Sequence, residues 1–264
     1  MHTPPLSSNA TSKQQEEYTI KRNKIIFIIC LSAIVLWNWG IKRPIYQFLF
    51  GTPTKTELHI SDNETYLNPP EFPTSKATIE GHEIEFKLLK QYYATGRVIY
   101  VDRYTNPFGR FYRDTDKGGG KRIYDEVVPQ DITFVVGDLA KYPELKGSHA
   151  YRAGGLDWED RTTRKIYYKH QHLYDTHLTN IHTIAASTNV QKGLDILKAG
   201  DIATLEGYLI YWSARLKTGH IMDFKSAVYA GEKHTKLIYG GAKGAGLCKQ
   251  LLLTKITFDG YTFE

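Results

Sequence analysis

The sequence contains little of what a disulfide-bonded or nucleic-acid-binding protein needs. It has only two cysteines in 264 residues, Cys30 and Cys248, and their surroundings differ so much that we expect no disulfide within the folded part. Basic and acidic residues are nearly balanced: residues 1–49 hold six Lys/Arg and two Asp/Glu, which leaves 28 and 26 for the remainder. Because a phosphate-binding surface requires a concentrated basic face, we expect no nucleic-acid partner.

Nucleotide-binding motifs are also missing. Gly241-x-x-Gly244-x-Gly246 follows an expected strand, but a dinucleotide-binding fold needs about thirty residues of strand, helix and strand and a later acidic residue. Only eighteen residues follow Gly246. Leu247 and Cys248 stand where a phosphate-binding loop has Lys and Ser/Thr. We therefore expect a tight glycine loop between two late strands, and no cofactor.

One long uncharged run is present, residues 25–41, with basic residues on both sides. A helix of this length reaches about 26 Å, close to a hydrocarbon core of about 30 Å. Trp37 and Trp39 lie near one end of the run, where aromatic rings favour the headgroup boundary. The run predicts a transmembrane helix over 25–41, or extending to about 49. The alternative, a cleaved secretory signal, lacks a small-residue cleavage site.

The domain boundaries follow from this run. Residues 1–24 are polar and predict a disordered cytoplasmic tail, 50–76 a proline-rich linker, and 77–264 a folded extracytoplasmic domain. Four basic residues precede the run and three follow it closely, which favours a cytoplasmic N-terminus. The predicted location is the inner membrane, single-pass, with a periplasmic C-terminal domain and membrane lipid as the partner of the helix.

The residues after 77 predict a mainly β domain. Alternating apolar and aromatic residues over 83–104, 127–135, 164–176 and 201–214 are typical of strands. In the last of these, Gly207 interrupts the wall of side chains and permits sharp coiling. The expected fold is β-rich α+β, a coiled antiparallel sheet or a small barrel of the oligomer-binding or SH3-like type.

One or two short helices are expected within this domain. Residues 189–201 predict a helix with Asn189 as its N-cap and Gly200 as its stop. Asp138 could cap a second short helix through Leu145.

Four histidines lie between residues 170 and 182. His170 and His172 stand two apart on an expected strand and share a face, which is compatible with metal ligation, and His177 is the third candidate. No H-E-x-x-H or H-x-x-E-H pattern accompanies them. The interpretation that we favour is that His170 and His172 are exposed polar positions and that His182 packs between strands, so no metal is expected.

Several short motifs lie in a fixed order between residues 125 and 264, behind a single N-terminal apolar run. They include N-x-H-x-I-x-A and G-x-G-x-C, and their positions are Pro129, Asp131, Gly137, Asn180, His182, Ile184, Ala186, Gly200, Gly207, Gly244, Gly246 and Cys248. Together these motifs resemble a family of single-pass envelope proteins of Gram-negative bacteria. The chain departs from the pattern at Leu178, Ala185, Leu247 and Lys249, where the family has Ser, Pro, a small residue and Glu. The resemblance implies location and topology, with no assigned activity.

The predicted function is a membrane-anchored, extracytoplasmic binding or scaffold protein of the bacterial envelope, with another envelope protein as its partner. An enzyme is the first alternative: a hydrolase with Asn180, His182 and Cys248 gathered in one cleft, where a thiol and an imidazole could act as nucleophile and base. A histidine metal-binding domain is the second alternative. The binding role is favoured, because the sequence alone does not show that these three residues meet.

Overall fold

The computed structural model describes residues 23–28, 30, 32, 40–55, 57–69, 74–79, 82–104, 127–148, 154–215, 221–226 and 248–264. The chain divides into two compact units, Met1–Leu49 and Phe50–Glu264. Each unit is described by itself below.

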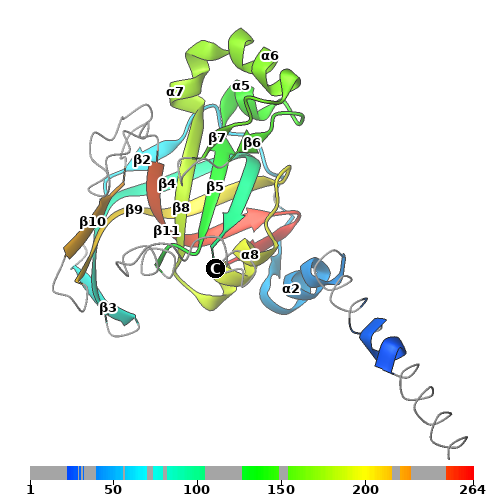
Figure 1. Cartoon of the computed structure of the whole chain (residues 1–264). Helices are drawn as coiled ribbons and strands as arrows, with labels where there is room; N and C mark the ends of the chain where they lie inside the picture. Colours follow the sequence, from blue (N-terminus) through cyan, green and yellow to red (C-terminus); the bar gives the residue numbers. More distant parts are fainter. Residues whose placement is uncertain are drawn as a thin grey trace, which may run out of the picture. The chain divides into compact units, whose positions relative to one another are not determined.

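The second unit is built mainly from strands (Figure 1). The strands are β1 (Thr52–Pro53), β2 (Thr65–Leu67), β3 (Ser75–Ile79), β4 (His82–Arg103), β5 (Gln130–Val135), β6 (Gly147–Ser148), β7 (Gly155–Leu156), β8 (Leu178–Ala185), β9 (Ile202–Arg215), β10 (Ile221–Lys225), β11 (Cys248–Phe258) and β12 (Tyr261–Phe263). The helices of this unit are α5 (Gly137–Ala140), α6 (Arg161–Lys169), the short 3-10 helix η2 (Gln171–Leu173), α7 (Tyr174–His177) and α8 (Thr188–Ile196). The predicted β-rich character is confirmed.

Five strands form a closed circuit. β4 pairs with β5, β5 with β8, β8 with β11, β11 with β9, and β9 again with β4. All of these pairs are antiparallel except β8 with β11, which are parallel. The prediction of a purely antiparallel sheet is therefore wrong. A parallel pair requires a crossover between its strands, and α8 and β9 lie in this crossover.

Gly207 allows β9 and β11 to approach closely. A Cβ atom at this position would lie only 2.1 Å from the carbonyl oxygen of Leu252, so a side chain there would push the two strands apart. The register of β11 against β9 shifts between Leu253 and Lys255. Such irregularities bend and twist a strand, which helps the sheet to close.

The predicted helix over 189–201 is confirmed as α8, but with different ends. Its N-cap is Ser187, whose side chain accepts a hydrogen bond from the backbone N–H of Val190 at 3.1 Å, instead of Asn189. Gly193 brings α8 close to β12, since a Cβ there would lie 2.8 Å from the ring of Phe263. The second predicted helix is shorter than expected: α5 ends at Ala140, and Asp138 pairs with Lys141 at 2.6 Å instead of capping it.

Residues 161–169 form α6, which corrects the prediction of a strand over 164–176. Asp160 caps the helix by accepting a hydrogen bond from the N–H of Thr162. Thr163 and Ile166 are buried three residues apart, the spacing of one helix face. The helix turns Tyr168 to solvent and packs the half-buried Tyr167 against the apolar cluster around Ile166. α5, α6 and α7 lie together beyond one end of β5 and β8 (Figure 1).

The segment predicted as a linker contributes to the folded unit. β1 pairs with β12, and β2 and β3 pair with β4. The side chain of Glu64 is buried in this unit. Residues 52–55 and 57–67 of the predicted linker are therefore part of the folded unit and not a spacer.

In the first unit, residues 23–28 are helical and α2 spans Lys42–Phe50. Among the residues that the structure describes, no helix is long and apolar enough to cross a membrane, which corrects the predicted transmembrane helix. Residues 1–22, 29, 31 and 33–39, including Trp37 and Trp39, lie outside the described residues. The membrane location and the lipid partner stay predictions.

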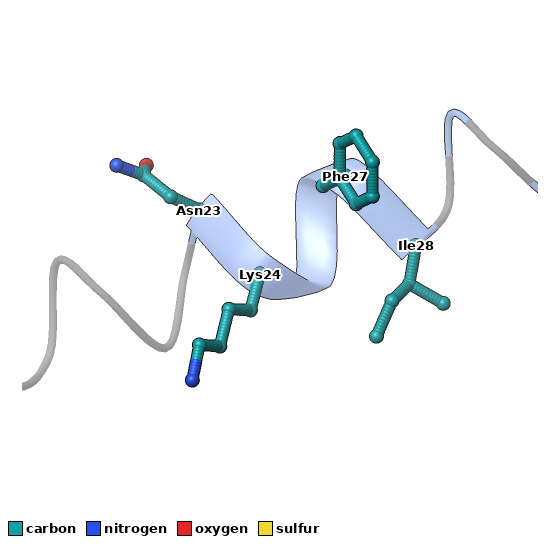
Figure 2. Close-up of a pocket in the computed structure, with 4 residues that line it drawn as sticks. All are labelled: Asn23, Lys24, Phe27 and Ile28. Carbon is teal, nitrogen blue, oxygen red and sulfur yellow. The ribbon is translucent and has the colours of Figure 1, made fainter.

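A surface depression in the first unit is lined by Asn23, Lys24, Phe27 and Ile28. Figure 2 shows that these four side chains come from one helical segment and point outward in different directions. The Phe27 and Ile28 side chains are exposed. The depression does not enclose a ligand, and we assign no site to it.

Candidate functional site

Three neighbouring strands bring the candidate residues together on one face of the sheet. In the register, Thr133 of β5 stands opposite Asn180 of β8, which stands opposite Cys248 of β11. Two residues further along β8, His182 stands opposite Asp131. Because side chains alternate along a strand, these five share a face, which we call the site face. The structure thus places Asn180, His182 and Cys248 next to one another, as the enzyme hypothesis requires.

His182 is held by a buried carboxylate. Its Nδ1 lies 2.6 Å from Oδ1 of Asp131, and both side chains are almost completely buried. The hydroxyl of Tyr104 donates a hydrogen bond to Oδ2 of the same carboxylate. Both carboxylate oxygens of Asp131 therefore have partners, which fixes its orientation and that of the imidazole ring.

The other side of the imidazole faces the thiol. Cys248 lies close enough to His182 to help raise the pKa of the imidazole, and because Asp131 engages Nδ1, Nε2 is the ring nitrogen left to face the thiol. Asn180 also contacts the sulfur, with its Nδ2 3.8 Å from Sγ. Cys248 is partly exposed, whereas Asn180, His182 and Asp131 are buried. Of these four side chains, that of Cys248 is therefore the one most accessible to a reactant.

The surroundings favour the charged form of His182. Burial alone lowers the pKa of a histidine, but the carboxylate of Asp131 and the hydrogen bond and charge of Cys248 outweigh it and raise the pKa of His182 to about 10. At neutral pH this residue is an imidazolium between a carboxylate and a sulfur. The protonated imidazole therefore lies beside the sulfur and can donate a proton to a group that reacts there.

The raised pKa of His182 predicts a loss of stability in alkali. The ordinary pKa is 6.5 and the folded value is about 10, so the stabilisation is complete below about pH 6.5 and is lost as the pH rises toward 10. The free energy of unfolding should fall by on the order of 5 kcal/mol across this window. Urea denaturation at several pH values measures it. In His182→Gln the fall should be largely absent, while the exposed-site control His172→Gln should retain it; equal slopes in all three proteins would contradict the assignment.

Next to the thiol, the site face is closed by buried groups. Gln250 accepts a hydrogen bond from the indole N–H of Trp212 at 3.1 Å, and its backbone N–H donates to Oγ of Ser226. Trp212 belongs to an apolar cluster against which Ile184 and Leu252 pack. The polar residues around Cys248 therefore lie beside a rigid apolar core, which limits their motion.

A second polar cluster lies on the opposite face of the same strands. The ammonium group of Lys249 pairs with Glu64 at 3.2 Å, and both side chains are almost fully buried. Lys249 also donates to Thr179 at 3.2 Å, and the hydroxyls of Tyr66 and Tyr92 donate to Glu64. Burial and the neighbouring Glu64 raise the pKa of Tyr92, so its hydroxyl keeps its proton. This cluster connects Glu64, next to β2, to Lys249 near the start of the described part of β11.

The three metal candidates do not form a ligand set. His170 ends α6, where its Nε2 lies 2.6 Å from the hydroxyl of Tyr142, and His172 lies in η2. The prediction that both stand on one strand is therefore wrong. His177 ends α7, and its Nδ1 lies 2.6 Å from Oγ1 of Thr176. Within the described ranges, no group of three or more His, Cys, Asp or Glu side chains could hold a metal ion.

Sequence reasoning missed several members of the site. Asp131 appeared only as a motif position without a role, and Tyr104 and Glu64 carried no signal. The available signal was Asp131 itself: an acidic residue within a mostly apolar strand needs a buried partner, and His182 is such a partner. Gly241, Gly244 and Gly246, which precede Cys248, lie outside the described residues.

Comparison with protein-family models, with curated proteins and with solved structures gives no match for this chain. The resemblance to an envelope-protein family stays a prediction. The function is therefore argued from the geometry around Cys248.

Proposed function

We propose that this protein is a cysteine-dependent acyl-transfer enzyme, a hydrolase or an acyltransferase. Cys248 is the nucleophile, His182 moves the proton, and Asp131 orients His182 and stabilises its charge. The observation that carries the proposal is that the partly exposed Cys248, His182 and the buried Asp131 lie together on the site face, with Nδ1 of His182 2.6 Å from Asp131 and Cys248 close enough to raise the pKa of His182. This is the arrangement of nucleophile, base and orienting acid that recurs in unrelated acyl-transfer enzymes.

The groups can carry a balanced reaction in two halves. In the first, the thiolate of Cys248 attacks the acyl carbon, the bond to the leaving group breaks, and His182 gives its proton to that group. The product is a thioester on Cys248, beside a neutral imidazole. In the second half, His182 takes a proton from water or another acceptor, whose oxygen attacks the thioester. The thiolate leaves, and the imidazolium is restored.

The position of Asp131 suits this role. A neutral imidazole must present the unprotonated Nε2 to the incoming acceptor, and a carboxylate that accepts a hydrogen bond from Nδ1–H enforces this tautomer. The Nδ1 to Oδ1 distance of 2.6 Å is that of a strong, charge-assisted bond. Tyr104 keeps the second oxygen of Asp131 engaged, so the carboxylate cannot rotate away from the ring.

The proposal predicts that an activated ester acylates Cys248. The full-length protein with Cys30→Ser, which leaves Cys248 as its only thiol, is incubated with p-nitrophenyl acetate. We expect release of p-nitrophenolate and one added acetyl group, found on Cys248 by peptide mass spectrometry. Cys248→Ala in the same background is the matched control and should show neither. Acetylation that is absent, or equal in the two proteins, would argue against the enzyme.

A binding or scaffold role is the second candidate, and the outer face of α6 favours it. Four basic side chains of this helix are exposed: Arg161, Arg164, Lys165 and Lys169. Trp158 and Tyr168 are also exposed, by 43% and 68%, and aromatic and arginine side chains are enriched in protein interfaces. The two candidates are separable, because Cys248→Ala removes the proposed acylation and leaves α6 unchanged.

A further inference from the structure

Asn180 is placed to act on the reacting group and not only on the fold. It lies on β8 between Thr133 and Cys248 of the neighbouring strands, and its side chain is buried. The amide nitrogen, a donor, is the end directed at the sulfur, at 3.8 Å. A thiol needs no amide donor of this kind for packing, since sulfur is a weak acceptor.

Gly154 lies beside the oxygen end of this amide. A Cβ atom on Gly154 would lie 2.4 Å from Oδ1 of Asn180 and 2.5 Å from Oγ1 of Thr133. The absence of a side chain at Gly154 therefore leaves room for the amide in the orientation whose nitrogen faces Cys248. The buried hydroxyl of Thr133, which has no hydrogen-bond partner among the residues described, lies at the same oxygen end.

We propose that Nδ2 of Asn180 binds the oxyanion that forms when Cys248 attacks a carbonyl carbon. When sulfur bonds to that carbon, the carbonyl oxygen is two bonds from sulfur and takes up negative charge. A donor 3.8 Å from the sulfur is within reach of an oxygen in that position. Side-chain amides serve this purpose in other acyl-transfer sites, and such a donor acts strongly where water is excluded.

This inference rests on the proposed acyl-transfer function and narrows its substrate class. The substrate must present a carbonyl that turns into an oxyanion, as in an ester, a thioester or an amide. An electrophile without such an oxygen, for example an alkylating agent that reacts at a saturated carbon, gains nothing from Asn180. The two kinds of reagent therefore separate the role of Asn180 from the reactivity of the thiol.

The test compares acylation with alkylation in the Cys30→Ser protein. Asn180→Ala should lower the rate of acetylation of Cys248 by p-nitrophenyl acetate by about 10²- to 10³-fold. Its rate of alkylation by iodoacetamide should stay within about threefold of the parent, because displacement at a saturated carbon forms no oxyanion. Thr183→Val is the control on the same strand: Thr183 is buried on the opposite face and bonds the carbonyl of Gln130, and we expect neither rate to change.

Gly154→Ala tests the same inference without replacing Asn180. Its methyl group would displace the amide oxygen and turn the nitrogen from the sulfur, so acetylation should fall by at least about tenfold with alkylation retained. Circular dichroism of each variant checks that the fold is kept.

Equal acetylation in Asn180→Ala and the parent overturns the oxyanion role alone. A parallel fall in both rates assigns Asn180 to the thiol and also overturns that role. A parent that is not acetylated overturns the acyl-transfer function and this inference with it.

Discussion

Replacing Asp131 by asparagine is expected to lower the rate of acetylation of Cys248 by on the order of 10³- to 10⁴-fold. The amide has nearly the same shape, but it carries no charge and can donate to Nδ1 of His182. It would then hold the imidazole as the wrong tautomer, with the proton on Nε2, and it would remove the charge that raises the pKa of His182 to about 10. His182 could neither stabilise the thiolate nor return the proton to the leaving group.

The measurement is the initial release of p-nitrophenolate by the Cys30→Ser protein, with and without Asp131→Asn. Asp138→Asn is the matched control, because Asp138 is an exposed carboxylate that pairs with Lys141 at the surface, and it should react at the parental rate. Tyr104→Phe, which removes one donor to Asp131, should cause a smaller loss. Acetylation by Asp131→Asn within about threefold of the parent would show that the hydrogen-bonded chain is not catalytic.

Replacing Lys249 by methionine should destabilise the protein by about 3 to 5 kcal/mol. The change leaves Glu64 buried without its cation, beside the two tyrosine hydroxyls that donate to it. An uncompensated buried charge is far more costly than the loss of the pair itself, because the partners of a buried ion pair have already given up their hydration. Urea denaturation measures the difference in unfolding free energy.

The double variant Lys249→Met with Glu64→Gln gives the decisive comparison. With no charge left to bury, it should recover most of the stability lost in the single variant. The surface pair Lys255 and Glu206, 3.0 Å apart and about one-third exposed, is the control. Lys255→Met with Glu206→Gln should change stability by less than about 1 kcal/mol. A single Lys249→Met as stable as the parent, or a double variant no better than the single, would contradict the buried-pair account.

The two clusters lie on opposite faces of adjacent residues of β11. Cys248 and Gln250 point to the site face, and Lys249 between them points to the opposite face. The Lys249–Glu64 pair therefore fixes the strand next to the nucleophile on the opposite face, while Asn180 and His182 lie beside the sulfur of Cys248 on the site face. Lys249, which stabilises the fold, is therefore adjacent in the strand to Cys248, the proposed nucleophile.

Local patterns predicted several elements well. The strands over 83–104 and 201–214 are β4 and β9, because alternation along one chain depends only on neighbours in sequence. The helix α8 was predicted from local signals, although its true N-cap is Ser187 and it ends at Ile196, before the predicted stop at Gly200. The strand predicted over 164–176 is wrong because the mixture of polar, apolar and aromatic residues resembled a strand, while the Asp160 cap and the contact of Ile166 with the core determined a helix.

The candidate site could be guessed only in part. Asn180 and His182 share a strand face by their spacing, but nothing local relates them to Cys248, which follows 66 residues after His182. The parallel pairing of β8 with β11 brings them together. Parallel partners are joined through a long crossover. Their register is therefore set by the packing of the intervening elements and not by a short turn with a recognisable sequence.

By itself, the sequence determined that this chain has a β-rich folded part with few helices, because side-chain alternation, caps and glycine stops act between residues close along the chain. Only the tertiary structure decided that the sheet is mixed and closed, that residues 52–55 and 57–67 belong to the folded unit, and that Asp131 and Glu64 are the buried partners of His182 and Lys249. The reason is physical: a buried charge needs a partner of opposite sign, and which residue supplies that partner depends on strand register across long stretches of chain.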